Sequence, residues 1–307
     1  MSLVAADLKG VLPALVTPFD KAGKFDPAAM SALIDRVFAA GAAGIVPLGG
    51  TGEYTALSHD ERLAVIETSV AAAKGRGPVI AGVLSPGFEE AAAAGKAFGA
   101  AGVDALMVVT PFYVIAGQQG LLDYYRRMRD EVGLPIVLYE IPTRTNVSYA
   151  PETVAALAEE GVAIGIKYSN YDMVKFTRVM RAAGDRMAVM SGEDSLLVAH
   201  MVLGAPGAIL ATANVYPEHW VECFNRASSG DFAGAAVLQK DLYPMIEAFF
   251  CEPNPGPLKK AMAIAGHDVG PVRLPLVDVT PETDARLRSV MRDVPDVSTS
   301  GRMARSA

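Results

Sequence analysis

The chain has 307 residues, of which 51% are hydrophobic and 20% charged, a composition typical of a globular protein with a large core. Its net charge of -7 argues against a nucleic-acid or anionic-membrane partner but not against a local basic pocket for a small acid. Two cysteines without a CxxC spacing cannot form a disulfide framework, and the N-terminus MSLVAADLKG lacks signal-peptide features, so we expect a cytoplasmic protein that spans no membrane.

Short apolar, β-branched runs recur along the chain, and Ala-rich helical patterns follow them. Both faces of these runs are apolar, which is typical of parallel strands buried between two layers. Their spacing of about 20 to 35 residues is the length of a βα unit. We predict eight strands, at residues 11–17, 44–48, 78–83, 105–109, 135–139, 163–167, 186–190 and 207–211.

The segments between the strands carry helix start and stop signals. Residues 26–41 and 58–75 open with Asp26 and Ser58 as N-caps and close with glycine. Eight such units predict the α/β class and a (β/α)8 TIM barrel over residues 1–215. Helical patterns dominate residues 216–295, which we interpret as a C-terminal helical extension packed on the barrel. Residues 296–307 have no apolar period and are expected to form a mobile tail.

Unusual polar residues gather where the predicted strands end. These strand ends read PLGGTGE, TPFY, YEIPTRT and SGED, and Lys167 ends the strand at residues 163–167. Active sites of such barrels are built at the carboxyl ends of the strands. The sequence therefore predicts one active site at this rim.

Lys167 follows a short apolar run, AIGI. If the strand alternates, Ala163, Gly165 and Lys167 point to one side, and the two small residues leave room for the lysine inside the barrel. Desolvation there favours the neutral amine, which is a nucleophile. Taken alone, Lys167 fits better as an ordinary strand-end lysine that reaches solvent.

Tyr139 ends the preceding strand, about 5 Å away in a barrel. A phenol beside an amine can shuttle protons as a carbinolamine forms and collapses, although a core tyrosine fits equally well. The GGTGE turn offers backbone N–H groups that can hold a carboxylate, with Thr51 adding a hydroxyl and Glu53 bracing the turn from behind. The guanidinium of Arg144 suits a second carboxylate. A plain Gly-rich connection and a surface ion pair are the alternatives for the turn and for Arg144.

From about residue 10 to residue 291, the chain resembles the dihydrodipicolinate synthase and N-acetylneuraminate lyase family. The resemblance rests on the order and spacing of seven motifs: GGTGE, TPFY, YEIPTRT, GIK, SGED, TANV and EPNPGPLK. The resemblance implies a Schiff base between Lys167 and a 2-oxo acid, usually pyruvate, with Tyr139 as proton shuttle and no cofactor. It implies that Thr51 and its neighbouring amides hold the substrate carboxylate.

The same resemblance implies that Tyr113 reaches the active site of an adjoining subunit, so a homo-oligomer, a tetramer or a dimer, is expected. Arg144 resembles the arginine that grips the second substrate's carboxylate. Gly50, Gly192 and Ile209 match further substrate-binding positions.

PxRT and EPNPxPxK are most similar to the synthase branch, which condenses pyruvate with aspartate 4-semialdehyde on the way to lysine. The chain departs from that branch at Gly50, at Glu140 and at Tyr168–Ser169, which follow Lys167 where IKEA or IKES is usual. Gly50 replaces a threonine whose hydroxyl links two tyrosines in a proton relay, and GGTGE is similar to the branch that dehydrates 5-dehydro-4-deoxyglucarate. Glu140 replaces the asparagine of YNxP and would stand beside the shuttle tyrosine.

The family's inhibitor site is also altered. His59 and Glu90 match its positions, but Pro86 stands where a side-chain amide is usual. Weak or absent inhibition by lysine is therefore expected.

Other functions remain open beside a lyase of the synthase type. The same Schiff base would serve a 2-keto-3-deoxy sugar-acid dehydratase or aldolase, or a cyclic-imine deaminase. A non-catalytic keto-acid sensor and a pyridoxal phosphate barrel enzyme, which would be yellow, are readings of other classes. The four histidines are dispersed without ligand spacing, so no metal site is expected.

Overall fold

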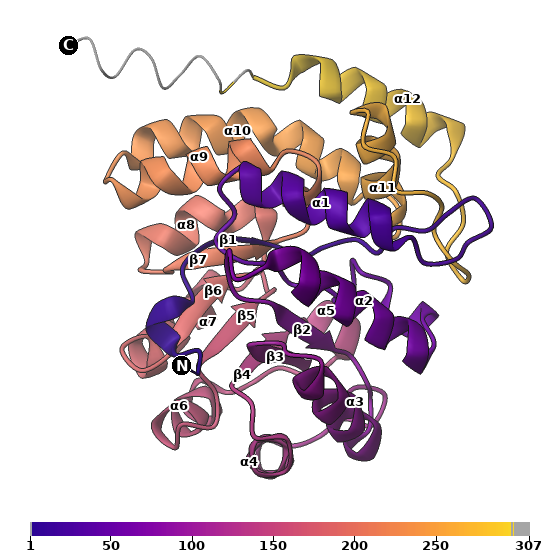
Figure 1. The fold of residues 1–307 in the computed structure, drawn as a ribbon. Helices are drawn as coiled ribbons and strands as arrows, with labels where there is room; N and C mark the ends of the chain where they lie inside the picture. Colours follow the sequence, from indigo (N-terminus) through magenta and orange to yellow (C-terminus); the bar gives the residue numbers. More distant parts are fainter. Residues whose placement is uncertain (1, 296, 298–307) are drawn as a thin grey trace.

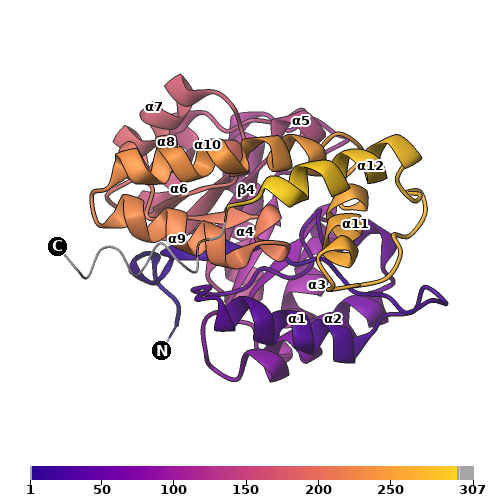
Figure 2. The same ribbon diagram turned by 90° about the horizontal axis from the view of Figure 1, so that it is seen from above.

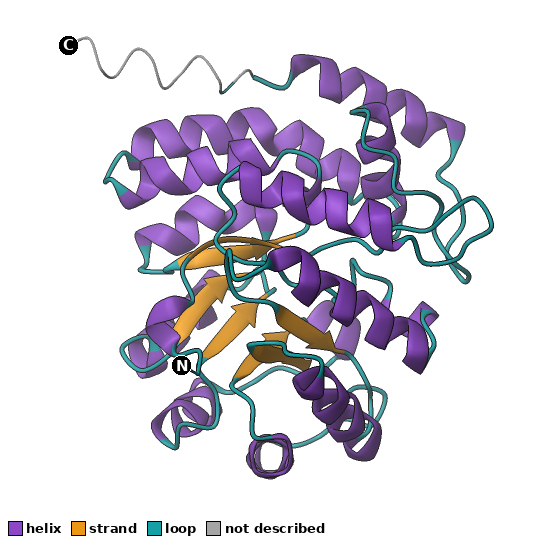
Figure 3. Ribbon diagram, viewed as in Figure 1, coloured by secondary structure: helices purple, strands orange, loops and turns teal. Residues whose placement is uncertain are grey.

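A curled parallel sheet forms the centre of the computed structural model, which describes residues 2–295 and 297 (Figures 1 and 3). Seven strands make up this sheet: Gly10–Pro13 (β1), Ile80–Val83 (β2), Ala105–Val109 (β3), Ile136–Glu140 (β4), Gly165–Tyr168 (β5), Ala188–Ser191 (β6) and Gly207–Leu210 (β7). Their order is β1-β7-β6-β5-β4-β3-β2, and every pair is parallel.

The second predicted strand, residues 44–48, is present only as two isolated bridges, Ala14 with Val46 and Ile45 with Val79. Its backbone still bonds to both neighbours, since Val46 N donates to Pro13 O and Ile45 N donates to Pro78 O, each at 2.9 Å. The ladder stops there because Leu48, at φ 62°, turns the chain out of the extended conformation. The segment lies between β1 and β2 and closes the (β/α)8 barrel.

The first predicted strand also ends earlier than expected. β1 stops at Pro13, and only Ala14 of the remaining predicted residues 14–17 pairs with a neighbouring strand. Thr17 instead turns toward the site, where its hydroxyl donates to Gly52 O at 2.7 Å.

Helices surround the sheet. The predicted caps are confirmed: Asp26 accepts hydrogen bonds from Ala28 N and Ala29 N, and Ser58 forms a capping box with Glu61. The α-helices are α1 (Pro27–Ala39), α2 (His59–Ala73), α3 (Phe88–Ala100), α4 (Gln118–Val132), α5 (Pro142–Thr145), α6 (Pro151–Glu159), α7 (Met173–Ala183), α8 (Leu197–Val202), α9 (Pro217–Ser228), α10 (Phe232–Phe249), α11 (Gly256–Ile264) and α12 (Pro281–Val290).

The C-terminal helices lie together on one side of the barrel (Figure 2). α9 contacts β1 as well as α8, and α10 contacts α9, α11 and α12. The predicted mobile tail falls outside the described residues except for residue 297. In the described part of the chain, no helix is long and apolar enough to cross a membrane.

Two apolar clusters separate the inside of the barrel from its outer layer. The inner cluster includes Leu8 and Tyr139, and the outer cluster fills the space between strands and helices. Leu8 closes the floor of the barrel, where a Cβ added to Gly165 would lie 2.7 Å from its side chain. The expectation that Ala163 shares the side of Lys167 is wrong: Ala163 belongs to the outer cluster, because β5 begins only at Gly165.

Candidate active site

Lys167 and Tyr139 lie side by side on neighbouring strands. They are register partners in the β4–β5 ladder, and the Lys167 Nζ lies 4.5 Å from the centre of the Tyr139 ring. Both side chains are buried, with exposed fractions of 6% and 5%. The amine and a proton-carrying phenol therefore share one enclosed space at the carboxyl ends of the strands.

Gly192 gives the lysine side chain its room. A Cβ at this position would lie 2.9 Å from Lys167 Cγ and 2.9 Å from Ser169 N, and it would collide with Ser169 Oγ. The glycine follows β6, whose Met190 is the register partner of Lys167. Residue 192 therefore touches the lysine stem, and only a glycine fits there without displacement of Lys167 or Ser169.

Two carboxyl groups follow Gly192. Asp194 is buried and accepts hydrogen bonds from Thr212 N at 2.9 Å and from Thr212 Oγ1 at 2.5 Å. Burial and the neighbouring Asp194 raise the pKa of Glu193 to about 7, an effect that Lys167 partly offsets. Burial also raises the pKa of Asp194, while its bonds to Thr212 lower it. Lys167 lies close enough to these two carboxyl groups to lower the pKa of each, against the effect of burial.

The GGTGE turn is fixed by contacts from the C-terminal part of the chain. Thr51 Oγ1 accepts a hydrogen bond from Asn254 Nδ2 at 3.0 Å. Glu53, at φ 55°, accepts from Arg273 N at 2.8 Å and lies 2.6 Å from Lys259 Nζ. The contact between Lys259 and Glu53 is an ion pair, although its geometry is not that of a hydrogen bond to Oε1. Both side chains are buried. The turn is thus braced from behind by Glu53.

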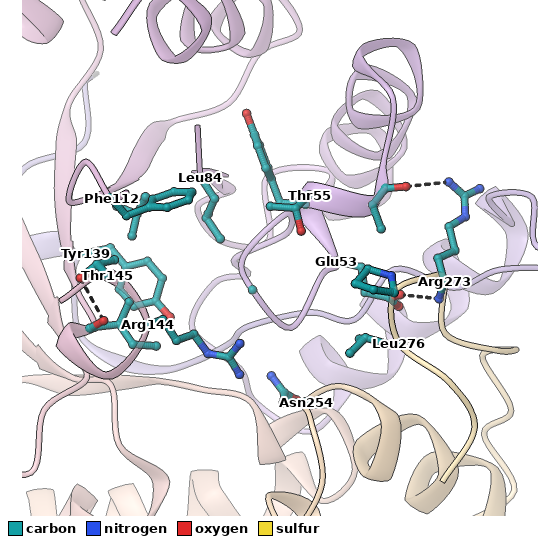
Figure 4. A pocket seen from close by; sticks show the side chains of 16 residues that line it. Glu53, Thr55, Leu84, Phe112, Tyr139, Arg144, Thr145, Asn254, Arg273 and Leu276 are labelled. Carbon is teal, nitrogen blue, oxygen red and sulfur yellow. Dashed lines mark hydrogen bonds between the residues drawn. The ribbon is translucent and has the colours of Figure 1, made fainter. Parts of the chain in front are cut away.

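A cavity of about 320 Å³ opens above the Tyr139 ring (Figure 4). Arg144, on the single turn of α5, points its guanidinium into this space, opposite Leu276 and near Asn254. Residues from both halves of the chain line the cavity: Gly50, Glu53, Tyr54, Thr55, Ala56, Leu84, Val109, Phe112, Tyr139, Ile141, Arg144, Thr145, Asn254, Arg273, Pro275 and Leu276.

The other predicted site residues lie in different surroundings: one lines the cavity, one is in the inner cluster and one is exposed. Gly50 lines the cavity, and a Cβ added to it would meet nothing within 4 Å. Ile209 lies in the inner cluster with Tyr139, below the cavity. Tyr113 is 93% exposed with φ 73°, and its neighbours Val114 and Ile115 are exposed as well, so this segment points away from its own cavity.

Glu140 does not enter the cavity. Its carboxylate is fully buried on the opposite face of β4 from Tyr139, where it pairs with Lys175 of α7. The expectation that it stands beside the shuttle tyrosine is wrong, because successive side chains of a strand point to opposite faces.

Several residues that line the cavity were not predicted individually from the sequence, among them Asn254, Arg273 and Leu276. Asn254 lies within EPNPGPLK, so the motif contained a signal for it. Arg273 and Leu276 carry no local pattern, and they reach the cavity only because the chain after α11 folds back over the GGTGE turn.

Comparison with known proteins gives a consistent result. The profile of the Dihydrodipicolinate synthetase family matches residues 7–294. A 4-hydroxy-tetrahydrodipicolinate synthase of Thermodesulfovibrio yellowstonii is 40% identical over 284 residues, covering 92% of this chain and 97% of that protein.

Two crystal structures are also similar. Dihydrodipicolinate synthase from Bacillus anthracis superposes with a TM-score of 0.92 at 32% identity, covering 96% of this chain and all of the other (100%). The chloride-inhibited dihydrodipicolinate synthase from Acinetobacter baumannii, crystallised with pyruvate, gives 0.91 at 34% identity, covering 94% and 99%.

The fold and the strand-end lysine define a TIM-barrel protein with its cavity at the carboxyl ends of the strands. The chain belongs to the dihydrodipicolinate synthetase family.

Proposed function

We propose that this chain is a cytoplasmic lyase, a 4-hydroxy-tetrahydrodipicolinate synthase that condenses pyruvate with aspartate 4-semialdehyde. The main supporting observation is the buried pair of Lys167 and Tyr139 beneath a cavity into which Arg144 points its guanidinium, which has no ion-pair partner among the described residues. Relatives with this name cover nearly the whole chain, and a similar structure was crystallised with pyruvate.

Lys167 begins the reaction in this proposal. Its Nζ attacks C2 of pyruvate, and loss of water gives an iminium that draws electrons from C3. Tyr139 carries the protons that the carbinolamine needs to form and collapse. Thr51 and the amides of its turn hold the pyruvate carboxylate.

The second substrate enters from the cavity above. Loss of a C3 proton gives an enamine, whose C3 attacks the aldehyde carbon of aspartate semialdehyde. The amino group of that substrate then adds to C2 and releases Lys167, which closes the ring. Arg144 holds the second carboxylate by a forked pair of hydrogen bonds.

The chain acts as a homo-oligomer, a dimer or a tetramer, in this proposal. Tyr113, Val114 and Ile115 form an exposed apolar segment beside the cavity, which is costly to leave in water. A neighbouring subunit would cover it and receive the Tyr113 hydroxyl.

Steady-state turnover with pyruvate and aspartate semialdehyde tests the function. A turnover number of about 1 per second or more supports it. Borohydride should trap pyruvate on the wild-type protein but not on Lys167→Ala. Trapping that persists in Lys167→Ala would remove the Schiff-base assignment.

Gly50 supports a second candidate, a dehydratase of a 2-keto-3-deoxy sugar acid. The open space at this residue leaves the cavity wider than a threonine would, and GGTGE is similar to that branch. Turnover of such an acid, without turnover of aspartate semialdehyde, would decide for this candidate.

Lysine is expected to inhibit weakly or not at all. At the position of the family's inhibitor site where a side-chain amide is usual, this chain has Pro86. Glu90 of the same site is already paired with Arg62 at 3.0 Å. Half-inhibition of turnover at sub-millimolar lysine would contradict this expectation.

A further inference from the structure

Glu140 is a fully buried carboxylate outside the cavity, and nothing in the reaction described above uses it. In the sequence it stands between Tyr139 and the segment that carries Arg144, but its side chain faces the helical layer. Its Oε2 has no hydrogen-bond partner in the described part of the chain. A buried charge with one unsatisfied oxygen costs stability, so an apolar residue of similar size would serve a purely structural role better.

The other oxygen of Glu140 accepts hydrogen bonds from three side chains. Glu140 Oε1 accepts hydrogen bonds from Lys175 Nζ at 2.6 Å, from Ser148 Oγ at 2.8 Å and from Asn170 Nδ2 at 2.9 Å. Lys175 Nζ also contacts Ser148 Oγ. The three partners come from three different segments, which meet at this one atom.

Two of these segments follow the catalytic strands. Ser148 ends the loop that begins directly after Glu140 and contains Arg144, so the bond from Ser148 to Glu140 ties the two ends of this loop together. Asn170 lies three residues after Lys167, and Ser169 N donates to Glu140 O at 2.9 Å. Lys175 lies in the first turn of α7, which Asp172 caps.

We propose that Glu140 and Lys175 are positioning residues that fix the Arg144 loop and thereby set the affinity for the carboxylate of the second substrate. This inference rests on the proposed function. The pair acts from outside the cavity, through Ser148 and the backbone of β4. Pyruvate binding should depend less on this loop, because Thr51 and Gly192 lie on other segments and Lys167 is held within the β5 ladder.

Glu140→Gln is the main test, since it removes the charge and keeps the shape, and Lys175 is partly exposed and can be hydrated. We expect the KM for aspartate semialdehyde to rise roughly tenfold, while the KM for pyruvate and the rate of borohydride trapping change less than about twofold. Lys96→Met, which removes a lysine from an exposed ion pair with Glu131, is the matched control and should leave both KM values unchanged.

Hydrogen exchange supplies a readout that does not need turnover. In Glu140→Gln, the amides of residues 141–149 should exchange roughly tenfold faster than in wild type, and Lys96→Met should match wild type. Unchanged exchange would overturn the proposal, whether or not the wild-type protein is a synthase. Faster exchange with equal rises in both KM values would also overturn it.

Failure of the proposed function looks different. If the wild-type protein shows no synthase turnover, aspartate semialdehyde is excluded as its second substrate. The hydrogen-exchange rates of residues 141–149 still decide whether Glu140 holds the loop. If Glu140→Gln does not fold, Ser148→Ala removes one contact to the same oxygen and should give the same KM split and the same faster exchange.

Discussion

Lys167 shows how one side chain depends on the sizes of its neighbours. Its stem runs past Gly192, and Gly165 lies below it against Leu8, so two glycines make room for it at different points. The Tyr139 ring covers its amine. The Lys167 side chain is therefore positioned by packing against its neighbours, which makes it sensitive to added volume.

Gly192→Ala should disturb Lys167 directly. The new methyl group would lie 2.9 Å from Lys167 Cγ and would collide with Ser169 Oγ. We expect a loss of about 1–3 kcal/mol in the free energy of unfolding, as for overpacking elsewhere, together with much slower borohydride trapping of pyruvate. Gly50→Ala is the control, since its methyl group meets open space and should leave stability within about 0.5 kcal/mol of wild type. Equal behaviour of the two variants would contradict this account of Gly192.

At the scale of elements, α11 and the GGTGE turn are joined by a buried ion pair. Lys259 of α11 lies 2.6 Å from Glu53, donates to Pro271 O at 2.8 Å and rests on the Phe19 ring. Burial lowers the pKa of Lys259 to about 8, and Glu53 partly opposes this shift. The C-terminal helices therefore hold the GGTGE turn through a buried charge, which would be destabilising without its partner.

Lys259→Met should destabilise the protein strongly, because it leaves Glu53 buried without its partner. We expect a loss of about 3–5 kcal/mol in the free energy of unfolding, measured by urea denaturation. The double variant Glu53→Gln with Lys259→Met should recover more than half of that loss. A double variant no more stable than Lys259→Met would show that the charge of Glu53 is not the cause.

Arg273 ties the segment after α11 to α2, and this tie should depend on pH. Its guanidinium bonds to both oxygens of Glu61, at 2.6 and 2.8 Å, and lowers the pKa of that carboxyl to about 2 from 4.5. The folded state thus binds this proton less tightly than the unfolded state, so the stabilisation is complete above pH 4.5 and is lost as pH falls toward 2.

Urea unfolding of wild type and Glu61→Gln over a pH series measures this dependence. The wild-type protein should be the more stable at about pH 6, and the difference should shrink steadily below pH 4.5. A difference that stays constant down to pH 2 would mean that the ion pair contributes nothing.

At the scale of the whole molecule, the Tyr113 segment points away from the cavity of its own chain. Its side chain is 93% exposed, while the cavity has Phe112 from the same loop in its wall. A tyrosine held outward beside an active site is suited to a site on another copy of the chain. This arrangement predicts complementation between defective subunits.

Lys167→Ala and Tyr113→Phe should each be nearly inactive alone but should regain activity when mixed and reassembled. A subunit with intact Lys167 then receives Tyr113 from its neighbour, so random pairing should restore about a quarter of wild-type turnover. Sedimentation of the wild-type protein should show an oligomer. No recovery in mixed oligomers that have formed would contradict a role of Tyr113 in the neighbouring site.

Local patterns predicted much of this molecule. Apolar runs that end at a glycine, a proline or a threonine located seven strands, and Asp26 and Ser58 located two helix starts, because burial and capping depend on neighbouring residues in the chain. Residues 44–48 were correctly placed in the barrel but not as a full strand, because the turn at Leu48 shortens their ladder.

The sequence by itself determined which strand ends carry the side chains of the candidate site, since the order of strands in a barrel follows the order of the chain. That order was sufficient to make Lys167 and Tyr139 neighbours. Only the tertiary structure decided that Glu140 faces the helices, that Arg273 reaches the cavity and that Lys259 pairs with Glu53. The first depends on the continuation of β4 through Glu140, one residue past the predicted strand end, and the other two are contacts across about 200 residues, which no local pattern of residue types encodes.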